Sequence, residues 1–208
     1  MAFAQFLAHP DVVEHLTLRS RVGFLALHGG LEPGTGELAG AAAERAGASC
    51  YAVHQPNDLK HHVPSVESDP DDAPRLAAFL AHVRIVVSVH GYWSRREELG
   101  HAILVGGGCR SLAVDLASRL RRALPDVTVV DDPDAIPPDL RGLDPRNPVN
   151  HAALGGVQLE LPPRVRVIGR VAERPEAAPY VAGTQTLIDA LATFAREVES
   201  NPARGADA

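Results

Sequence analysis

Short apolar runs alternate with amphipathic segments along the chain. Three runs are rich in β-branched residues and flanked by Gly, Pro or charge, as in buried strands of a largely parallel sheet: 22–27, 84–89 and 127–132. Further strands are predicted at 49–53, 101–106 and 156–161. Helical patterns fall between them, at 35–47, 71–83, 109–124 and 183–200. This alternation predicts an α/β three-layer sandwich with a mostly parallel, mixed sheet.

Local signals set the expected ends of these elements. Thr35 is the expected N-cap of the helix at 35–47, and Gly47 lies where that helix should end. The loops are expected at 55–71, 131–151 and 170–179, and residues 201–208 read as a flexible tail. The middle loop is long and rich in Pro, which favours a functional role, because long ordered loops in compact domains often carry function.

Bulk composition narrows the class of protein. A chain of 208 residues with 45% hydrophobic residues predicts one domain over 1–200. The net charge of −6 argues against nucleic acid as a partner. Cys50 and Cys109 are expected to be reduced, buried apolar residues. Neither a signal peptide nor a run of about 18 apolar residues is present, so we expect a cytoplasmic protein without a membrane anchor. The oligomeric state is not predictable.

Polar side chains end three of the predicted strands. His28 ends the first, with Glu32 just after it, His90 ends the second, and Glu160 lies near the end of 156–161. Ligands of open α/β sheets bind beyond the carboxyl ends of the strands. Two His and one Glu are a ligand set of catalytic zinc, and a further carboxylate can serve as the general base. Each piece alone has a plainer reading: the HGG segment as a turn, and Glu160 as a solvent-facing strand residue.

The glycines near these residues fit the same hypothesis. Gly29 and Gly30 can adopt backbone angles that turn His28 and Glu32 towards one metal ion. Gly91, directly after the second histidine, would leave room for substrate.

An ordered series of motifs resembles the phage and bacterial poly-γ-glutamate hydrolase family. They are HGGLEPGTGELA (28–39), SVHGYW (88–93), VGGGCRSLAVDLASRL (105–120), GLDPRNPVN (142–150) and GVQLELPPRVR (156–166). The resemblance implies a zinc-carboxypeptidase-like fold with one Zn²⁺ ion held by His28, Glu32 and His90, and with Glu160 as the catalytic carboxylate. The family's loop commonly has three glycines, one more than here, which leaves Glu37 as the alternative carboxylate ligand.

Other residues are candidates for substrate contacts within such a site. The oxyanion of amide hydrolysis needs a positive or N–H donor. Arg110, Arg146 and Arg164 are candidates, with Arg110 and Arg164 as catalytic residues and Arg146 as a substrate-binding one. Asn147 and Asn150 either bind substrate or form turns, and Tyr92 and Trp93 either line the pocket or pack in the core. His61 or His62 either lines the site or forms an exposed loop pair.

The substrate is predicted less narrowly than the reaction. The resemblance implies cleavage of γ-glutamyl linkages in poly-γ-glutamate or a related anionic peptide. A protein without an export signal would meet such an external polymer only after lysis, as a phage protein would. The alternatives are a zinc deacylase of a small N-acyl amino acid and a catalytically degenerate, phage-associated binding protein.

Overall fold

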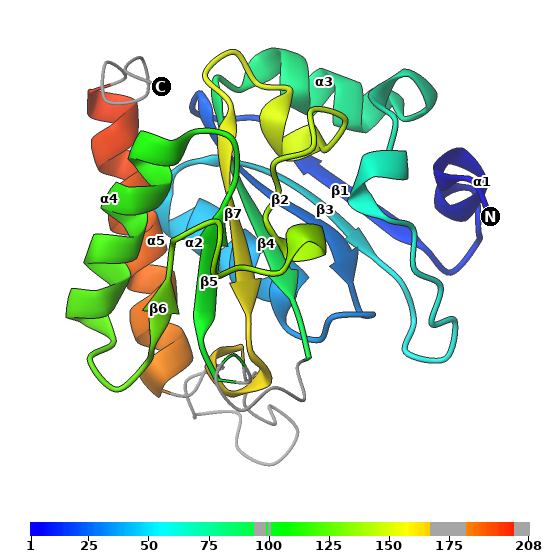
Figure 1. Cartoon of the computed structure of the whole chain (residues 1–208). Coiled ribbons are helices and arrows are strands. Elements are labelled where there is room, and N and C mark those ends of the chain that lie inside the picture. The colour runs from blue at the N-terminus through cyan, green and yellow to red at the C-terminus, as the bar shows by residue number, and fades with distance from the viewer. Residues whose placement is uncertain (94–98, 100, 167–181, 202–208) are drawn as a thin grey trace, which may run out of the picture.

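Seven strands form one mixed sheet in the order β1-β3-β2-β4-β7-β5-β6 (Figure 1). The computed structural model describes residues 1–93, 99, 101–166 and 182–201. The strands are β1 (Val13–Thr17), β2 (Val22–Gly29), β3 (Ser49–His54), β4 (Ile85–Gly91), β5 (Ile103–Gly106), β6 (Val129–Val130) and β7 (Gly156–Leu161). The adjacent pairs β3–β2, β2–β4, β4–β7 and β5–β6 are parallel, whereas β1–β3 and β7–β5 are antiparallel.

Helices cover both faces of this sheet, as the sequence predicts. One face packs against α2 (Thr35–Ala46), α4 (Arg110–Ala123) and α5 (Ala182–Ser200), and the other against α1 (Phe3–Leu7) and α3 (Pro74–His82) (Figure 1). Leu112, Leu116 and Leu120 of α4 are fully buried in the first of these layers. Of the described helices, none is long and apolar enough to cross a membrane.

Several element boundaries differ from the sequence-based expectation. The strand expected at 127–132 is reduced to β6, beyond which the Asp131 carbonyl accepts a hydrogen bond from Arg110 instead of pairing with a strand. The edge strand β1 was not predicted, because its side chains are exposed or half-buried and form no apolar run. The N-cap of α2 is Gly34, in the left-handed region at φ 91°, and Thr35 is the first helical residue.

The expected loops are partly ordered into short 3₁₀ turns. Loop 55–71 contains Ser65–Glu67 and the start of Pro70–Asp72, and loop 131–151 contains Pro138–Leu140 and Pro148–Asn150. The segments 170–179 and 202–208 lie outside the described residues. Cys109 is buried and Cys50 only partly so, and both are free thiols. Burial raises the pKa of Cys50 to about 11.

Candidate metal centre

The parallel strands β2, β4 and β7 bring their carboxyl ends to one edge of the sheet. Residues Val86 and Leu25 mark the α1/α3 face, and by alternation His90 on β4 and Glu160 on β7 share that face. His90 and Glu160 are also register partners across the β4–β7 pair. On β2, simple alternation would not bring His28 to this face of the sheet.

A β-bulge on β2 changes the direction of His28. Phe24 and Ala26 pack into the α2/α4/α5 layer, so strict alternation would direct His28 into the same layer and away from His90. The register between β2 and β3 shifts between Ala26 and Gly29, with one more residue on β2 than on β3. Such a bulge re-aims the side chains that follow it. His28 therefore reaches the same face of the sheet as His90.

The loop after β2 closes as a single tight turn. The Glu32 N–H donates to the His28 carbonyl at 2.9 Å, and the Thr35 hydroxyl donates to the Glu32 carbonyl at 2.8 Å. Gly30 has φ +85°, and a Cβ there would lie 1.9 Å from the Gln55 carbonyl oxygen. The turn places residues four apart on one side, as in a helix. The two-glycine loop is therefore long enough to bring Glu32 back to His28.

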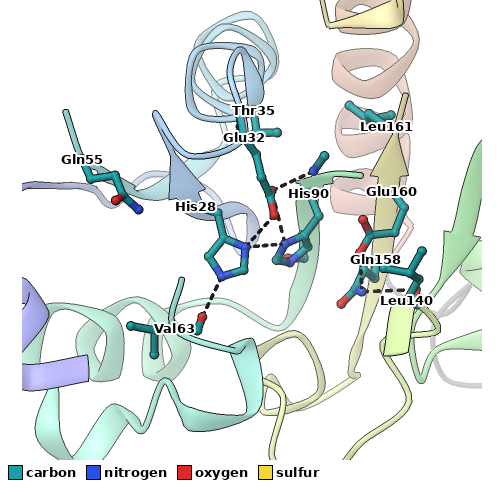
Figure 2. A network of polar contacts seen from close by, with 12 residues as sticks. His28, Glu32, Thr35, Gln55, Val63, His90, Leu140, Gln158, Glu160 and Leu161 are labelled. Carbon is teal, nitrogen blue, oxygen red and sulfur yellow. Dashed lines mark hydrogen bonds and ion pairs between the residues drawn. The ribbon is translucent and has the colours of Figure 1, made fainter. Parts of the chain in front are cut away.

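Three ligand atoms converge at this point. His28 Nδ1 lies 2.9 Å from Glu32 Oε1 and 3.2 Å from His90 Nδ1, and His90 Nδ1 lies 3.7 Å from Glu32 Oε2 (Figure 2). Of the described His, Cys, Asp and Glu residues, this trio is the group close enough to hold one metal ion. Tetrahedral zinc with bonds of about 2.05 Å separates its ligand nitrogens by roughly 3.3 Å. The observed spacing of the two nitrogens fits such an ion.

The hydrogen bonds behind the cluster decide which atoms can bind a metal. His28 Nε2 lies 2.9 Å from the Val63 carbonyl, which can only accept, so this nitrogen carries a proton. His90 Nε2 lies 2.9 Å from the Ser88 hydroxyl. In the neutral His28 ring the lone pair is then on Nδ1, facing a carboxylate oxygen and a second ring nitrogen. The lone pair of His28 and the Glu32 oxygen that faces it repel each other unless a cation lies between them, which is the chemistry that a divalent metal satisfies.

The charge states follow the same pattern. Burial lowers the pKa of His90 to about 4, despite Glu32 nearby, so the ring is neutral at pH 7. Burial alone would raise the pKa of Glu32, but the hydrogen bond from His28, the nearby His28 and His90 rings and the Gly91 N–H lower it overall. Burial alone would lower the pKa of His28, yet Glu32 outweighs it and the pKa is raised. The cluster attracts positive charge, whether from a proton or from a metal.

Glu160 faces the same pocket and is 4% exposed. Its Oε1 accepts a hydrogen bond from Gln158 Nε2 at 2.9 Å (Figure 2). Gln158 Oε1 in turn accepts from Asn147 Nδ2 at 3.0 Å. Burial, reinforced by the charge of Glu32, raises the pKa of Glu160 well above its usual value. A carboxylate that binds a proton this readily is suited to proton transfer.

The pocket has a volume of about 450 Å³. The trio and Glu160 line it, and loop 131–151 contributes Pro138, Asp139, Leu140, Gly142, Leu143, Asp144 and Asn147 to the lining. The long loop predicted from the sequence thus lies at the pocket, and its functional role stays a prediction. None of the described residues that line the pocket is Arg or Lys.

The three arginines proposed from the sequence lie away from that lining. Arg110 donates to the Asp131 carbonyl, and Arg164 donates to the carbonyls of His101 and Asp126. Arg146 is exposed, and its guanidinium donates two hydrogen bonds to the carboxylate of Asp144, a pocket residue. Each guanidinium thus has a structural partner, and of the three only Arg146 adjoins a residue of the pocket wall.

Of Asn147, Asn150 and Tyr92, which were predicted from the sequence to bind substrate, only Asn147 is among the described residues that line the pocket. Asn147 lines the pocket, and its Oδ1 also accepts from Val149 N to cap a 3₁₀ turn. Asn150 ties loop carbonyls of Gly142 and Asp144 to the Gly108 N–H. Tyr92 is buried and donates to the carbonyls of Leu99 and Ala102.

Of the loop histidines, His62 lines the pocket, with its ring centroid 4.8 Å from that of His28. His61 instead packs against Phe6. Trp93 is 79% exposed. Glu37 lies outside the trio that could hold a metal, near His54, so Glu32 is the carboxylate that the structure brings to the histidines.

Arg166 is a residue beside the site that sequence reasoning did not single out. Its guanidinium fills the space next to Gly91, where a Cβ would lie 2.7 Å from Cζ, so the space expected for substrate at this glycine is occupied by the arginine. The charges of Glu32 and Glu160 both act on it, although burial lowers its pKa overall. A hint was present in the sequence, because the motif at 156–166 ends on this arginine.

Comparison with known proteins identifies the family. The model of the poly-γ-glutamate hydrolase family matches residues 5–172. The chain belongs to the poly-γ-glutamate hydrolase family. Members of this family are hydrolases that act on amide bonds, so the chain is assigned to that class of enzyme.

Solved structures support the zinc-carboxypeptidase-like α/β fold of this family member. A bacteriophage poly-γ-glutamate hydrolase has a TM-score of 0.68 at 24% identity, over 92% of this chain and 89% of the other. A zinc-free structure of YNDL has a TM-score of 0.71 at 24% identity, over 88% and 89%. A gene product of Agrobacterium tumefaciens has a TM-score of 0.57 at 12% identity, over 94% and 98%. No curated protein matches the sequence.

Proposed function

We propose that the protein is a zinc-dependent hydrolase of γ-glutamyl amide bonds, with poly-γ-glutamate or a related anionic peptide as substrate. The observation that carries the proposal is the convergence of His28 Nδ1, His90 Nδ1 and the Glu32 carboxylate, with Glu160 facing the same pocket. The substrate class is supported by membership of the poly-γ-glutamate hydrolase family. We assign the whole activity to a single domain, residues 1–200.

In this proposal His28, Glu32 and His90 hold one Zn²⁺ ion. When bound, the ion polarises the scissile carbonyl and lowers the pKa of water in the site. The Val63 carbonyl holds the ring of His28, and the Ser88 hydroxyl holds that of His90, so that both Nδ1 atoms face inward. The Gly91 N–H donates to Glu32 Oε2 at 2.7 Å and fixes the second carboxylate oxygen.

Glu160 is the proposed general base and, later, the general acid. It removes a proton from the attacking water, whose oxygen bonds to the amide carbon. It then returns the proton to the amide nitrogen, and the C–N bond breaks to give a carboxylic acid and an amine. Gln158 holds the carboxyl group in place and is itself fixed by Asn147 and by the Leu140 carbonyl. Proton transfer to a positioned side chain contributes about 10²- to 10⁴-fold.

Metal content and activity test the proposal in sequence. Wild-type protein should contain one zinc per chain, and His28→Ala and His90→Ala should each lose it. Glu160→Gln should retain zinc and lose about 10²- to 10⁴-fold in hydrolysis of poly-γ-glutamate. Glu44→Gln, an exposed carboxylate on α2, is the matched control and should retain both.

Two results would overturn the assignment. Full zinc retention in either histidine variant would remove the ligand set, and unchanged activity in Glu160→Gln would remove the base. Substrate class is read from the same preparations by comparing poly-γ-glutamate with N-acetylglutamate. Turnover of the latter alone would favour a small-molecule deacylase.

A further inference from the structure

Arg166 connects two segments that carry different parts of the site. Its Nε donates to the Leu161 carbonyl at 3.2 Å, at the end of β7, one residue after Glu160. Its Nη1 donates to the Pro33 carbonyl at 2.5 Å, one residue after Glu32. One planar guanidinium thus bridges the strand of the proposed base and the loop of the proposed carboxylate ligand.

The surroundings of Arg166 are shaped around it. A Cβ on Gly91 would lie 2.7 Å from Arg166 Cζ and Nε, and a Cβ on Gly34 would lie 2.3 Å from the Arg166 carbonyl oxygen. Gly91 is also the residue whose N–H donates to Glu32 Oε2. The arginine therefore packs against the end of β4 as well as bonding to the β7 end and to the ligand loop.

Nearby carboxylates offset part of the cost of burying the Arg166 charge, although burial lowers its pKa overall. Glu32 and Glu160 are the carboxylates whose charges act on Arg166, and both are largely buried. Arg can donate from a rigid fork in two directions at once, which the single ammonium of Lys cannot do with the same geometry. Both donor bonds are to backbone carbonyls, so they fix the path of the chain on each side.

We propose that Arg166 is a positioning residue of the metal centre, which holds the Glu32 loop against the end of β7 and so sets the place of the Glu32 carboxylate. The proposal rests on the proposed function, because Glu32 must be a metal ligand. Arg166 acts through Glu32, and no contact between Arg166 and the substrate is required.

The test is a double-mutant cycle read as zinc affinity, measured by competition with a chromophoric chelator. The four proteins are wild type, Arg166→Gln, Glu32→Ala and the double variant. Arg166→Gln should weaken zinc binding about 10- to 100-fold, as loss of a residue that orients a ligand does. In the Glu32→Ala background the same substitution should change affinity by less than about threefold, because the carboxylate that Arg166 positions is gone.

Two further variants separate positioning from general stability. Arg21 lies directly before the amino end of β2 and donates to the His82 carbonyl. Arg21→Gln removes this arginine and should leave zinc affinity unchanged. Arg166→Lys keeps the charge and should bind zinc with intermediate affinity. Urea unfolding of the metal-free proteins gives the stability lost by each variant.

The outcomes are distinguishable. Equal weakening of zinc binding by Arg166→Gln in both backgrounds, or a loss no larger than that of Arg21→Gln, would overturn the positioning role and leave the proposed function intact. Failure of the wild-type protein to bind zinc would overturn both. Coupling in the cycle together with no hydrolysis of any γ-glutamyl substrate would support the positioning role and overturn the proposed function.

Discussion

Gly30→Ala tests how the turn after β2 is built. Gly30 has φ +85°, where a residue with a Cβ loses about 1–2 kcal/mol. The added Cβ would also lie 1.9 Å from the Gln55 carbonyl oxygen. This obstacle is backbone and cannot rotate away, and Gln55 N is itself bonded to the Gly29 carbonyl at 2.9 Å. Overpacking of this kind costs about 1–3 kcal/mol, so the total loss of unfolding free energy should be about 2–5 kcal/mol.

The matched control is Gly47→Ala, at the C-cap of α2. Gly47 also has a positive φ, +65°, but no heavy atom of the described structure lies within 4 Å of a Cβ built there. This variant should therefore lose only the backbone share, about 1–2 kcal/mol. The difference between the two variants isolates the contact with Gln55.

Urea unfolding of the metal-free proteins and zinc affinity are the two assays. Because segment 55–63 also carries the carbonyl that orients His28, we expect Gly30→Ala to weaken zinc binding at least about tenfold. Gly47→Ala should bind zinc as wild type does. The reasoning would be refuted by a Gly30→Ala protein that is no less stable than Gly47→Ala and binds zinc equally well.

Three further predictions concern the residues around the pocket. In metal-free protein the raised pKa of Glu160 means that the folded state keeps a proton that the unfolded state has released, so this group's contribution to stability falls as pH rises above about 4.5. The stability difference between wild type and Glu160→Gln, from urea unfolding at several pH values, should then decrease by up to about 1.4 kcal/mol per pH unit, and a flat difference would contradict the assignment. Gln158→Leu removes the partner of the buried Asn147 amide and should lower the free energy of unfolding, measured in urea, by about 1–3 kcal/mol. It should also lower kcat and leave KM little changed, because the side chain that holds Glu160 is lost. An unaltered kcat would argue against that role. Tyr92→Phe should lose about 1–2 kcal/mol by thermal unfolding, because the Ala102 carbonyl loses its donor, while kcat/KM stays constant; a raised KM would instead assign Tyr92 to substrate binding.

Much of the architecture follows from local patterns in the sequence. The apolar runs at 22–27 and 84–89 are buried strands because their residues must leave water on both sides of the sheet. His28, Glu32 and His90 could be predicted to lie together as candidate ligands because the carboxyl ends of parallel strands meet at one edge. The edge strand β1 was missed, since an exposed strand buries too little apolar surface to leave a pattern.

Tertiary structure alone decided which way the site residues point. A period of two directs His28 away from His90, and only the bulge on β2, formed by pairing with β3, returns it to the common face. The sequence likewise left Glu160 undecided between solvent and pocket, and pairing of β7 between β4 and β5 settles that it faces the pocket.

The sequence by itself determined the chemistry available: two histidines and carboxylates at strand ends, and the glycines that let the chain turn there. Contacts between distant segments decided which of these side chains come together, such as those of His28 with the Val63 carbonyl and of Arg166 with the Pro33 carbonyl. The physical reason is that side-chain direction depends on register, and register is a property of paired strands and not of either strand alone.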